Sequence, residues 1–231
     1  MHNKKFIICA CEHKNMKKVN FLFRKTIPET SVKRLILYRR CLERMQEEGT
    51  ITVLSEDIGR KCGVSGAVIR KDLSYFGVFG VRGKGYNVKD LIKGMDDLIF
   101  SKDDIDVILI GAGKLGQAIL NHSEEKCRVK FAAAFDRDPK KIGKKINDIE
   151  VLPPKEMKHY VKKNKIKLAV IAIPCSEAQE AVNSLVDAGI KAILSMALAP
   201  VNVPDDVHVS FMDVLPEVEF LHFKLRQRSI I

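Results

Sequence analysis

The feature that most constrains this chain is a glycine-rich turn that follows a short apolar segment. Val107–Ile110 holds four apolar residues in succession, as buried parallel strands do. It leads directly into the run Gly111-Ala112-Gly113-Lys114-Leu115-Gly116, which fits the pattern G-x-G-x-x-G, and Asp136 ends the next apolar stretch 20 residues after Gly116. Because a strand, a glycine turn, a helix and an acid occur in this order, the sequence predicts a Rossmann-type dinucleotide-binding domain from about Asp104 onward.

Each part of this motif has a physical role in holding a dinucleotide. Gly111 permits the sharp turn, Gly113 lets backbone amides approach the pyrophosphate, and Gly116 lets the helix pack closely on the strand. The helix N-terminus adds N–H donors and a partial positive charge. Asp136 would accept hydrogen bonds from the adenosine ribose and repel a 2′-phosphate, which favours NAD(H) over NADP(H), although Arg137 beside it weakens that preference. The alternative is a glycine turn that only packs, next to a surface acid.

Alternating strands and helices continue beyond this motif. The predicted strands are Val107–Ile110, Phe131–Phe135, Leu168–Ile173, Ala192–Leu194 and Val207–Phe211, with helical stretches at about 114–122, 154–164 and 176–188. This alternation predicts an α/β fold, a doubly wound parallel sheet with right-handed crossovers. Pro174 and Cys175 follow the third strand and face the crevice where such folds bind ligands; Cys175 is either a small pocket-lining residue or a direct redox sensor. The predicted NAD(H) site comprises Gly111, Ala112, Gly113, Lys114, Leu115, Gly116, Asp136, Arg137, Pro174 and Cys175.

The first half of the chain has a helix-turn-helix pattern. Its predicted helices run from Thr30 or Ser31 to about Glu48, from Ser55 to Cys62, and from Ser65 onward. Ser55 and Ser65 are the expected N-caps of the second and third helices, and Gly63-Val64 forms the turn between them. Arg70 and Lys71 face outward from the third helix, so this helix carries a basic surface.

A glycine-rich segment follows and is predicted to form a wing. Residues 77–85 contain four glycines, a density that excludes a helix. Apolar residues on both sides of Gly83-Lys84-Gly85 predict two short strands joined by a basic turn within Phe76–Val88. A further helix from Lys89 to Phe100 connects this domain to the Rossmann domain.

The charge distribution suggests an anionic partner for the first half. Residues 1–100 hold 20 Lys and Arg against 11 Asp and Glu, whereas residues 101–231 hold 20 against 18. The alternative is a basic, solvated face with no partner. No run reaches the roughly 18 apolar residues of a membrane helix, and the apolar segment at Phe6–Cys11 is too short for a signal peptide. We therefore expect a cytoplasmic protein.

The cysteines and histidines do not form the pattern of a metal site or of a catalytic site. Cys9-Ala10-Cys11 with His13 lacks the second ligand pair of a structural zinc site, so no metal is expected. Cys41, Cys62 and Cys127 fall on apolar faces and are interpreted as small core residues of a reducing compartment. None of the six histidines suggests a catalytic dyad, and too few residues remain after the first βαβ unit for a substrate lobe. A nucleotide pocket without catalytic groups, joined to a basic helix-turn-helix, indicates a sensor rather than an enzyme.

One segment carries a specific resemblance. The run Val68-Ile-Arg-Lys-Asp-Leu-Ser-Tyr-Phe-Gly77, continued by Phe79-Gly80 and Arg82-Gly-Lys-Gly-Tyr86, resembles the recognition helix and wing of the Rex redox-sensing transcriptional repressors. The resemblance extends from about Thr26 to the end of the chain. It implies a homodimer that binds an inverted-repeat operator on double-stranded DNA and is released when NADH, the sensed form, binds in preference to NAD+ between the two domains.

The resemblance also assigns residues. DNA contacts fall to Ser65, Ala67, Arg70, Lys71, Arg82, Lys84 and Tyr86. A switch that pairs an arginine with an aspartate of the other subunit aligns with Arg40 and Asp213, while His122 stands where the family commonly has a participating tyrosine. The family's Asn-Phe-Ala-Pro near the nicotinamide is replaced by Ser195-Met-Ala-Leu198, and its swapped C-terminal helix matches Pro216–Gln227.

The resulting organisation has five parts. They are an extension (1–24), a winged-helix DNA-binding domain (25–88), a connecting helix (89–103), the Rossmann NAD(H)-binding domain (104–213) and a C-terminal helix swapped in the dimer (214–231). Two alternatives remain open on the sequence. One is a small NAD- or CoA-binding enzyme whose basic N-terminus binds an acidic substrate; the other is a winged-helix module with a vestigial pocket.

Overall fold

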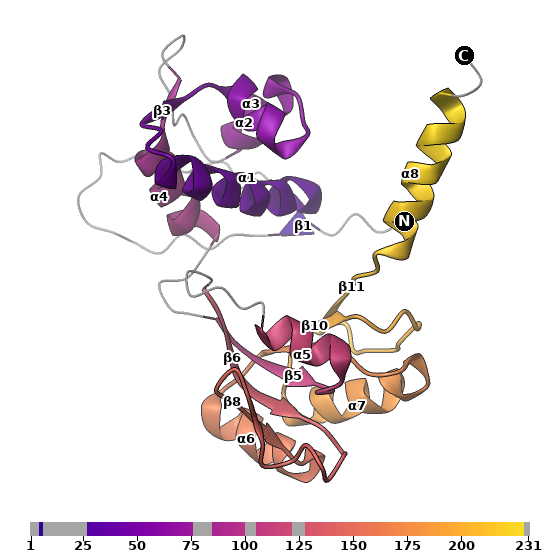
Figure 1. Cartoon of the computed structure of the whole chain (residues 1–231). Helices are drawn as coiled ribbons and strands as arrows, with labels where there is room; N and C mark the ends of the chain where they lie inside the picture. The colour runs from indigo at the N-terminus through magenta and orange to yellow at the C-terminus, as the bar shows by residue number, and fades with distance from the viewer. Residues whose placement is uncertain (1–4, 7–26, 76–84, 100–104, 122–127, 229–231) are drawn as a thin grey trace. The chain divides into compact units, whose positions relative to one another are not determined.

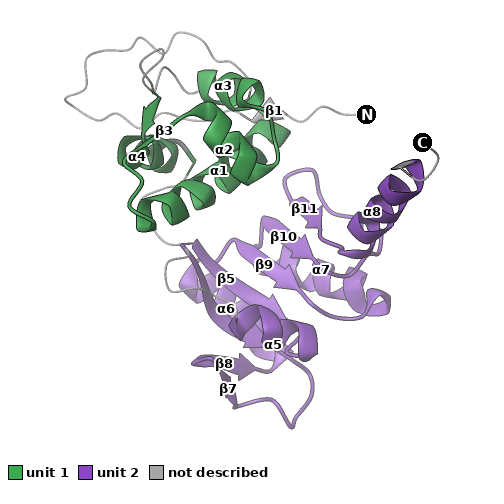
Figure 2. Ribbon diagram, turned by 45° about the horizontal axis from the view of Figure 1, so that its top comes forward, with its two compact units in different colours: residues 1–103 green, residues 104–231 purple. Residues whose placement is uncertain are grey.

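The computed structural model describes residues 5–6, 27–75, 85–99, 105–121 and 128–228. The chain divides into two compact units, Met1–Asp103 and Asp104–Ile231 (Figure 2). Each unit has its own hydrophobic core, and each is considered by itself below. Among the described residues, no helix combines the length and the apolar character needed to cross a membrane.

Unit 1 is built from four helices and short strand pairs. The helices are α1 (Glu29–Glu47), α2 (Ser55–Cys62), α3 (Gly66–Ser74) and α4 (Val88–Ile99); β3 (Thr52–Val53) pairs antiparallel with β4 (Tyr86–Asn87), and β1 (Lys5–Phe6) pairs with β2 (Ile27–Pro28). The core is formed by the apolar faces of all four helices and includes Leu35, Leu42, Ile58, Ile69 and Leu91. The helix α4, expected as a connector, places Val88, Leu91 and Met95 in this core.

The two helices of the helix-turn-helix, α2 and α3, are capped at their N-termini in different ways. Ser65 is the N-cap of α3, as predicted, and its hydroxyl accepts the Val68 amide at 3.4 Å. The prediction for Ser55 was wrong: Leu54 is the N-cap residue of α2, and its amide donates to the Asp57 carboxylate at 3.2 Å. Asp57 can supply this bond from the first turn, so the buried Ser55 hydroxyl is free for the long-range contact described below.

Unit 2 is the predicted doubly wound sheet (Figure 1). Its strands are β5 (Ile105–Ile110), β6 (Val129–Phe135), β7 (Lys145–Ile146), β8 (Ile149–Leu152), β9 (Leu168–Ile171), β10 (Ala192–Ser195) and β11 (His208–Phe211), in the spatial order β11-β10-β9-β5-β6-β8-β7. All neighbours are parallel except β7 and β8. The strand order reverses direction at β5 and β9, and such a switch point is where open parallel sheets bind ligands.

The hairpin β7–β8 was not predicted from the sequence. Its turn is Asn147-Asp148, and both residues have positive φ, 47° and 63°. Asn and Asp tolerate this left-handed conformation better than other residues with a side chain, which is why a two-residue hairpin turn forms there.

Helices cover both faces of this sheet. The helices are α5 (Lys114–Asn121), α6 (Met157–Asn164) and α7 (Ala178–Ala188), with the short 3₁₀ turns η1 (Pro154–Glu156) and η2 (Cys175–Glu177). Alternate residues of β5 point to opposite faces: Ile108 packs with Val161 of α6 and Val182 of α7, whereas Val107 and Leu109 pack in the cluster that contains Leu120 of α5. Burial on both faces explains the unbroken apolar run in this strand.

The last helix, α8 (Leu215–Arg228), exposes its apolar side chains. More than half of the residue surface is exposed at Leu215, Val218, Phe220, Leu221, Phe223 and Leu225. An exposed apolar surface of this extent marks an interaction site in a soluble protein.

Candidate dinucleotide site and DNA-binding helix

Two glycines of the turn after β5 are required by the fold itself. Gly111 has φ +95°, and a Cβ built on it would lie 2.5 Å from the carbonyl oxygen of Ala172 in the segment after β9. A Cβ on Gly116 would lie 2.0 Å from the Gly111 carbonyl oxygen. Neither position tolerates a side chain, so both glycines allow close approach of backbone segments.

Gly113 differs from these two. Its φ is not positive, and a Cβ built on it would meet no atom within 4 Å. An alanine would therefore fit this backbone without strain. The space beside Gly113 is therefore open at the amides that begin α5, where Lys114 and Leu115 are exposed and where a helix N-terminus offers free N–H donors.

Asp136 lies at the end of β6 and is held by three donors. Its Oδ2 accepts the Ala112 amide at 2.8 Å and the Lys141 ammonium at 2.9 Å, and its Oδ1 accepts the Asp138 amide at 2.8 Å. Burial raises the pKa of this carboxyl, but the donors from Asp138, Lys141 and Ala112 outweigh burial and hold the pKa below its usual range. The group is therefore an anion that fixes the glycine turn beside β6.

The segments after β6 and β9 meet through an ion pair. Arg137, next to Asp136, pairs with Glu177 of η2. These segments follow the two strands that flank β5, so the pair lies at the carboxyl edge of the sheet. Pro174 and Cys175 are exposed at the same edge. The sequence-predicted nucleotide residues are thus brought together by three neighbouring strands.

The outer face of α3 carries the basic residues predicted from the sequence. Ala67, Arg70 and Lys71 are exposed, whereas Ile69 and Leu73 are buried in the core. Tyr86 is half-buried in β4. Arg82 and Lys84, the predicted basic residues of the wing, lie outside the described residues.

Arg70 has two partners that the sequence did not indicate. Its Nη1 donates to the hydroxyl of Ser55 at 2.7 Å and to Oε1 of Glu56 at 2.5 Å. The hydrogen bond from Arg70 is the main reason that the pKa of Glu56 lies below its usual value. Nη1 is thereby occupied, and the Nε–Nη2 side of the guanidinium carries the remaining donors for a bidentate partner.

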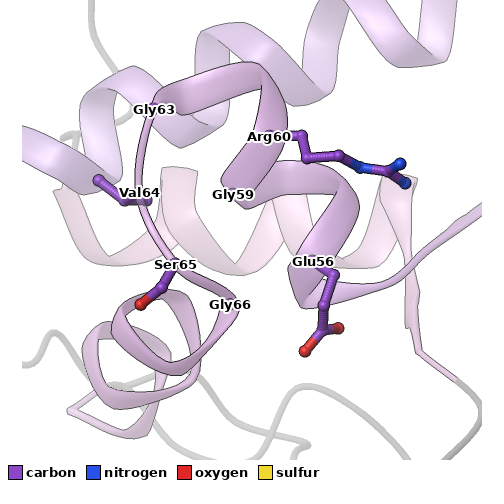
Figure 3. A pocket seen from close by; sticks show the side chains of 7 residues that line it. All are labelled: Glu56, Gly59, Arg60, Gly63, Val64, Ser65 and Gly66. Atoms are coloured by element: carbon purple, nitrogen blue, oxygen red, sulfur yellow. The ribbon is translucent and has the colours of Figure 1, made fainter.

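A hollow lies between α2 and α3 beside this contact (Figure 3). Its lining residues are Glu56, Gly59, Arg60, Gly63, Val64, Ser65 and Gly66. Glu56 and Arg60 both extend from α2 on one side of the hollow (Figure 3). The turn before α3 lies close against α2 here: a Cβ built on Gly59 would lie 2.4 Å from the Val64 carbonyl oxygen.

A buried polar cluster holds α3 on α1. Asp72 is only 1% exposed and accepts two hydrogen bonds of 2.7 Å from Nε and Nη2 of Arg34 and one of 2.9 Å from the fully buried Tyr38 hydroxyl. Burial raises the pKa of Asp72, but the bonds from Arg34, Ser31 and Tyr38 outweigh it and keep the pKa below its usual value. The cluster is fully bonded, so it fixes the helix rather than destabilising it.

The residues predicted for the switch are only partly described. Arg40 is exposed on α1 in unit 1, and His122 lies outside the described residues. Asp213, in unit 2, accepts the Leu215 amide at 3.0 Å and so caps α8. Ser195 is fully buried, with its hydroxyl bonded to the backbone of Ala197, and Leu198 is half exposed.

Comparisons with known proteins cover both units. Residues 26–74 match the family model "Putative DNA-binding protein N-terminus", and residues 102–199 match the "CoA binding domain". The chain is 43% identical to the redox-sensing transcriptional repressor Rex of Desulforamulus reducens, over 86% of this chain and 95% of that protein. It is 42% identical to the Rex of Pelotomaculum thermopropionicum, over 88% and 96%.

Solved structures give the same relationship. RSP, a Rex-family repressor, superposes with a TM-score of 0.78 at 32% identity, over 89% of this chain and 97% of RSP. RSP in complex with beta-NADH has a TM-score of 0.79 at 31% identity over the same shares, and RSP with beta-NAD+ and operator DNA has 0.78 at 35%, over 89% and 96%. Given full-length similarity to curated members and the shared two-domain fold, this chain belongs to the Rex family of redox-sensing transcriptional repressors.

Proposed function

We propose that this protein is a repressor that binds an inverted-repeat operator as a homodimer in the cytoplasm and releases it when NADH binds. The observation that carries the proposal is Gly113, a glycine that the fold does not require and that leaves open space at the start of α5. The relationship to RSP, which has been solved with NADH and with NAD+ plus operator DNA, supports the same conclusion.

The dinucleotide site is assigned to the carboxyl edge of β5, β6 and β9. The pyrophosphate would lie against the amides from Gly113 to Leu115 at the start of α5, with Gly111 and Gly116 shaping the turn. The ribose hydroxyls would donate to Asp136, whose negative charge disfavours a 2′-phosphate. Ala112, Lys114, Arg137, Pro174 and Cys175 complete the lining.

Lys141 adds a refinement to this site. Three N–H donors already occupy the Asp136 carboxylate, and Lys141 is the only side chain among them. The two backbone donors are fixed by the turn, so Lys141 is the donor that moves when the ribose binds. The lysine keeps the buried carboxylate neutralised while the site is empty.

The DNA-binding surface is assigned to the outer face of α3 and to the wing. Ser65, Ala67, Arg70 and Lys71 would enter the major groove, with Arg82, Lys84 and Tyr86 of the wing beside the backbone. Glu56 and Ser55 hold Arg70 in one orientation, which leaves its fork available for the O6 and N7 atoms of a guanine.

A second copy of the chain is the proposed partner for α8. The helix exposes six large apolar residues to solvent, so in the dimer it would pack against the other subunit. Arg40, His122 and Asp213 are the residues proposed to join the two subunits differently in the DNA-bound and NADH-bound states. Because two half-sites need a fixed spacing, a modest rotation of the subunits would end simultaneous binding.

The deciding experiment is a titration of a protein–operator complex by fluorescence anisotropy. NADH should release the operator at concentrations at which NAD+, NADPH and CoA do not. Operator binding that no NADH:NAD+ ratio weakens would exclude the sensing function. Tighter binding of CoA than of NADH would instead favour a CoA-binding protein, the ligand named by the "CoA binding domain" match over residues 102–199.

A further inference from the structure

Two thiols from different helices meet inside unit 1. Cys41 lies in the middle of α1 and Cys62 is the last residue of α2, 21 residues later, yet their Sγ atoms are 3.0 Å apart. Both are half-buried free cysteines. A disulfide has a sulfur–sulfur distance of about 2.05 Å, so the two sulfurs need to close by only about 1 Å.

The two thiols have different roles in the pair. Burial, together with the hydrogen bond to Cys41, raises the pKa of the Cys62 thiol. Cys62 therefore keeps its proton and donates it to Cys41, at 3.0 Å. Cys41, which accepts this bond, is taken as the sulfur that is oxidised first, with Cys62 as the resolving thiol beside it.

We propose that Cys41 and Cys62 form a reversible thiol–disulfide site that weakens operator binding when it is oxidised. With a peroxide as oxidant, the Cys41 sulfur attacks the peroxide, which is reduced to water as Cys41 becomes a sulfenic acid. The Cys62 sulfur then displaces that oxygen: the S–S bond forms, the S–O bond breaks, and the oxygen leaves as water with the Cys62 proton. A dithiol reductant reverses the oxidation by thiol–disulfide exchange.

The position of Cys62 connects this site to the recognition helix. Cys62 is followed by Gly63, with φ +69°, then by Val64 and by Ser65, the N-cap of α3. The turn is tightly packed, since Gly59 lies against the Val64 carbonyl. A pull on Cys62 toward α1 is therefore passed to the start of α3 and changes the angle between α2 and α3.

The effect on DNA rests on the proposed operator binding. In a helix-turn-helix, one helix crosses the DNA backbone while the next enters the major groove, so both must hold one mutual angle. The far part of α3 stays fixed on α1 through Asp72 and Arg34. Oxidation would thus distort the helix-turn-helix of α2 and α3, which the Cys41–Cys62 link and the Asp72–Arg34 bonds both attach to α1. This effect would not require a bound dinucleotide.

The test uses the full-length protein without dinucleotide. The reduced protein is treated with diamide or hydrogen peroxide, the remaining thiols are alkylated, and the linked peptides are mapped by mass spectrometry. We expect a Cys41–Cys62 link, and an operator Kd that rises about tenfold and recovers with dithiothreitol, equivalent to about 1.4 kcal/mol. Cys11→Ala, which removes a cysteine that belongs neither to the pair nor to the proposed nucleotide site, should respond like the wild type, whereas Cys62→Ala should not respond.

Two results would overturn the proposal. One is that Cys41 and Cys62 both remain open to alkylation after oxidation; the other is that the link forms while the operator Kd stays constant. A reduced protein that binds no operator would instead contradict the proposed function, and the peptide map would still decide whether the disulfide forms.

Discussion

At the scale of single residues, the three glycines after β5 are of two kinds: two are required by the fold, and one is not. Gly111 and Gly116 leave no room for a Cβ, whereas Gly113 does. All three were predicted from the sequence as one motif, because the pattern G-x-G-x-x-G describes them together. Only the structure distinguishes which of them the protein needs when its site is empty.

A pair of alanine substitutions tests this distinction. Gly113→Ala should change the free energy of unfolding by less than about 1 kcal/mol, since the new methyl group meets no atom and an alanine restricts the unfolded chain. It should nevertheless lower NADH affinity at least about tenfold, or about 1.4 kcal/mol, because the methyl group occupies space beside the pyrophosphate. Calorimetry with NADH and thermal unfolding measure the two effects.

Gly116→Ala is the matched control. A methyl group 2.0 Å from the Gly111 carbonyl oxygen forces the backbone apart and should destabilise the domain by roughly 1–3 kcal/mol. Unchanged NADH affinity in Gly113→Ala would contradict the assignment of this turn to the pyrophosphate.

Glu56 offers a second residue-scale prediction, in which two effects have opposite signs. An acid on the DNA-binding face repels phosphates, so Glu56→Gln should strengthen binding to a scrambled duplex. If Glu56 aims Arg70 at a base, the same change should weaken operator binding by about 1–3 kcal/mol, the usual value of a bidentate contact. Fluorescence anisotropy with the operator and with the scrambled duplex measures the ratio of the two affinities.

The control for this experiment is Glu48→Gln. Glu48 is an exposed acid of the same unit that pairs with Lys61 instead, and its loss should leave the ratio of the two affinities unchanged. A parallel gain on both duplexes in Glu56→Gln would mean that Glu56 only repels DNA.

At the scale of elements, the recognition helix depends on one buried carboxylate. The hydrogen bonds that Asp72 accepts from Arg34 and Tyr38 join α3 to α1 across 38 and 34 residues of sequence. Removal of one member leaves a buried charge without its partner, which typically costs several kcal/mol. The sequence contained Asp72 within a distinctive run, but nothing in its spacing showed what it binds.

The pH dependence of unfolding should reveal this cluster. The folded-state pKa of Asp72 lies below the unfolded value of about 3.9, so its contribution is complete above that value and is lost as the pH falls through the lower, folded-state pKa. Asp72→Asn should unfold at a lower temperature than the wild type at pH 7. Its stability should also fall less steeply between roughly pH 5 and 2, the range over which the Asp72 carboxylate of the wild type takes up its proton.

The exposed Asp97 of α4 supplies the comparison. Asp97→Asn should have the unfolding temperature of the wild type at neutral pH, and that temperature should fall as steeply as in the wild type when the pH is lowered. If Asp72→Asn has the stability and pH profile of the wild type, the cluster does not hold α3.

At the scale of the whole molecule, α8 is a helix whose large apolar residues remain exposed in the single chain. Substitution of Phe220 and Phe223 by Asp should dissociate the proposed dimer, because both residues are about half exposed in the single chain and would be buried in that dimer. Sedimentation equilibrium should then report a monomer. Operator affinity should fall sharply, since one subunit binds one half-site.

The neighbouring charged positions provide a control. Glu217→Gln and Lys224→Gln change charge on the same helix without removing apolar surface, so the dimer should persist. A dimer that survives the double Phe substitution would place the subunit interface elsewhere.

The sequence by itself determined the elements and their order. Apolar periodicity, the capping serine at position 65 and the spacing from Gly111 to Asp136 are properties of short segments, so they could be recognised without coordinates. Family resemblance then led to the proposal of which residues of α3 contact DNA. The exceptions were local: the Asn147-Asp148 hairpin, the two-residue strands β1, β2 and β3, and the cap of α2, where Asp57 acts instead of Ser55.

Only the tertiary structure decided which side chains meet across the sequence. The partners of Arg70, Asp72 and Cys62 lie 14 to 38 residues away, and their contacts depend on how α1, α2 and α3 cross. A helix pattern fixes which face is buried, but it does not fix the angle or the register at which two buried faces pack. For that reason the positioning of Arg70 and the thiol pair appeared only when the helices were assembled.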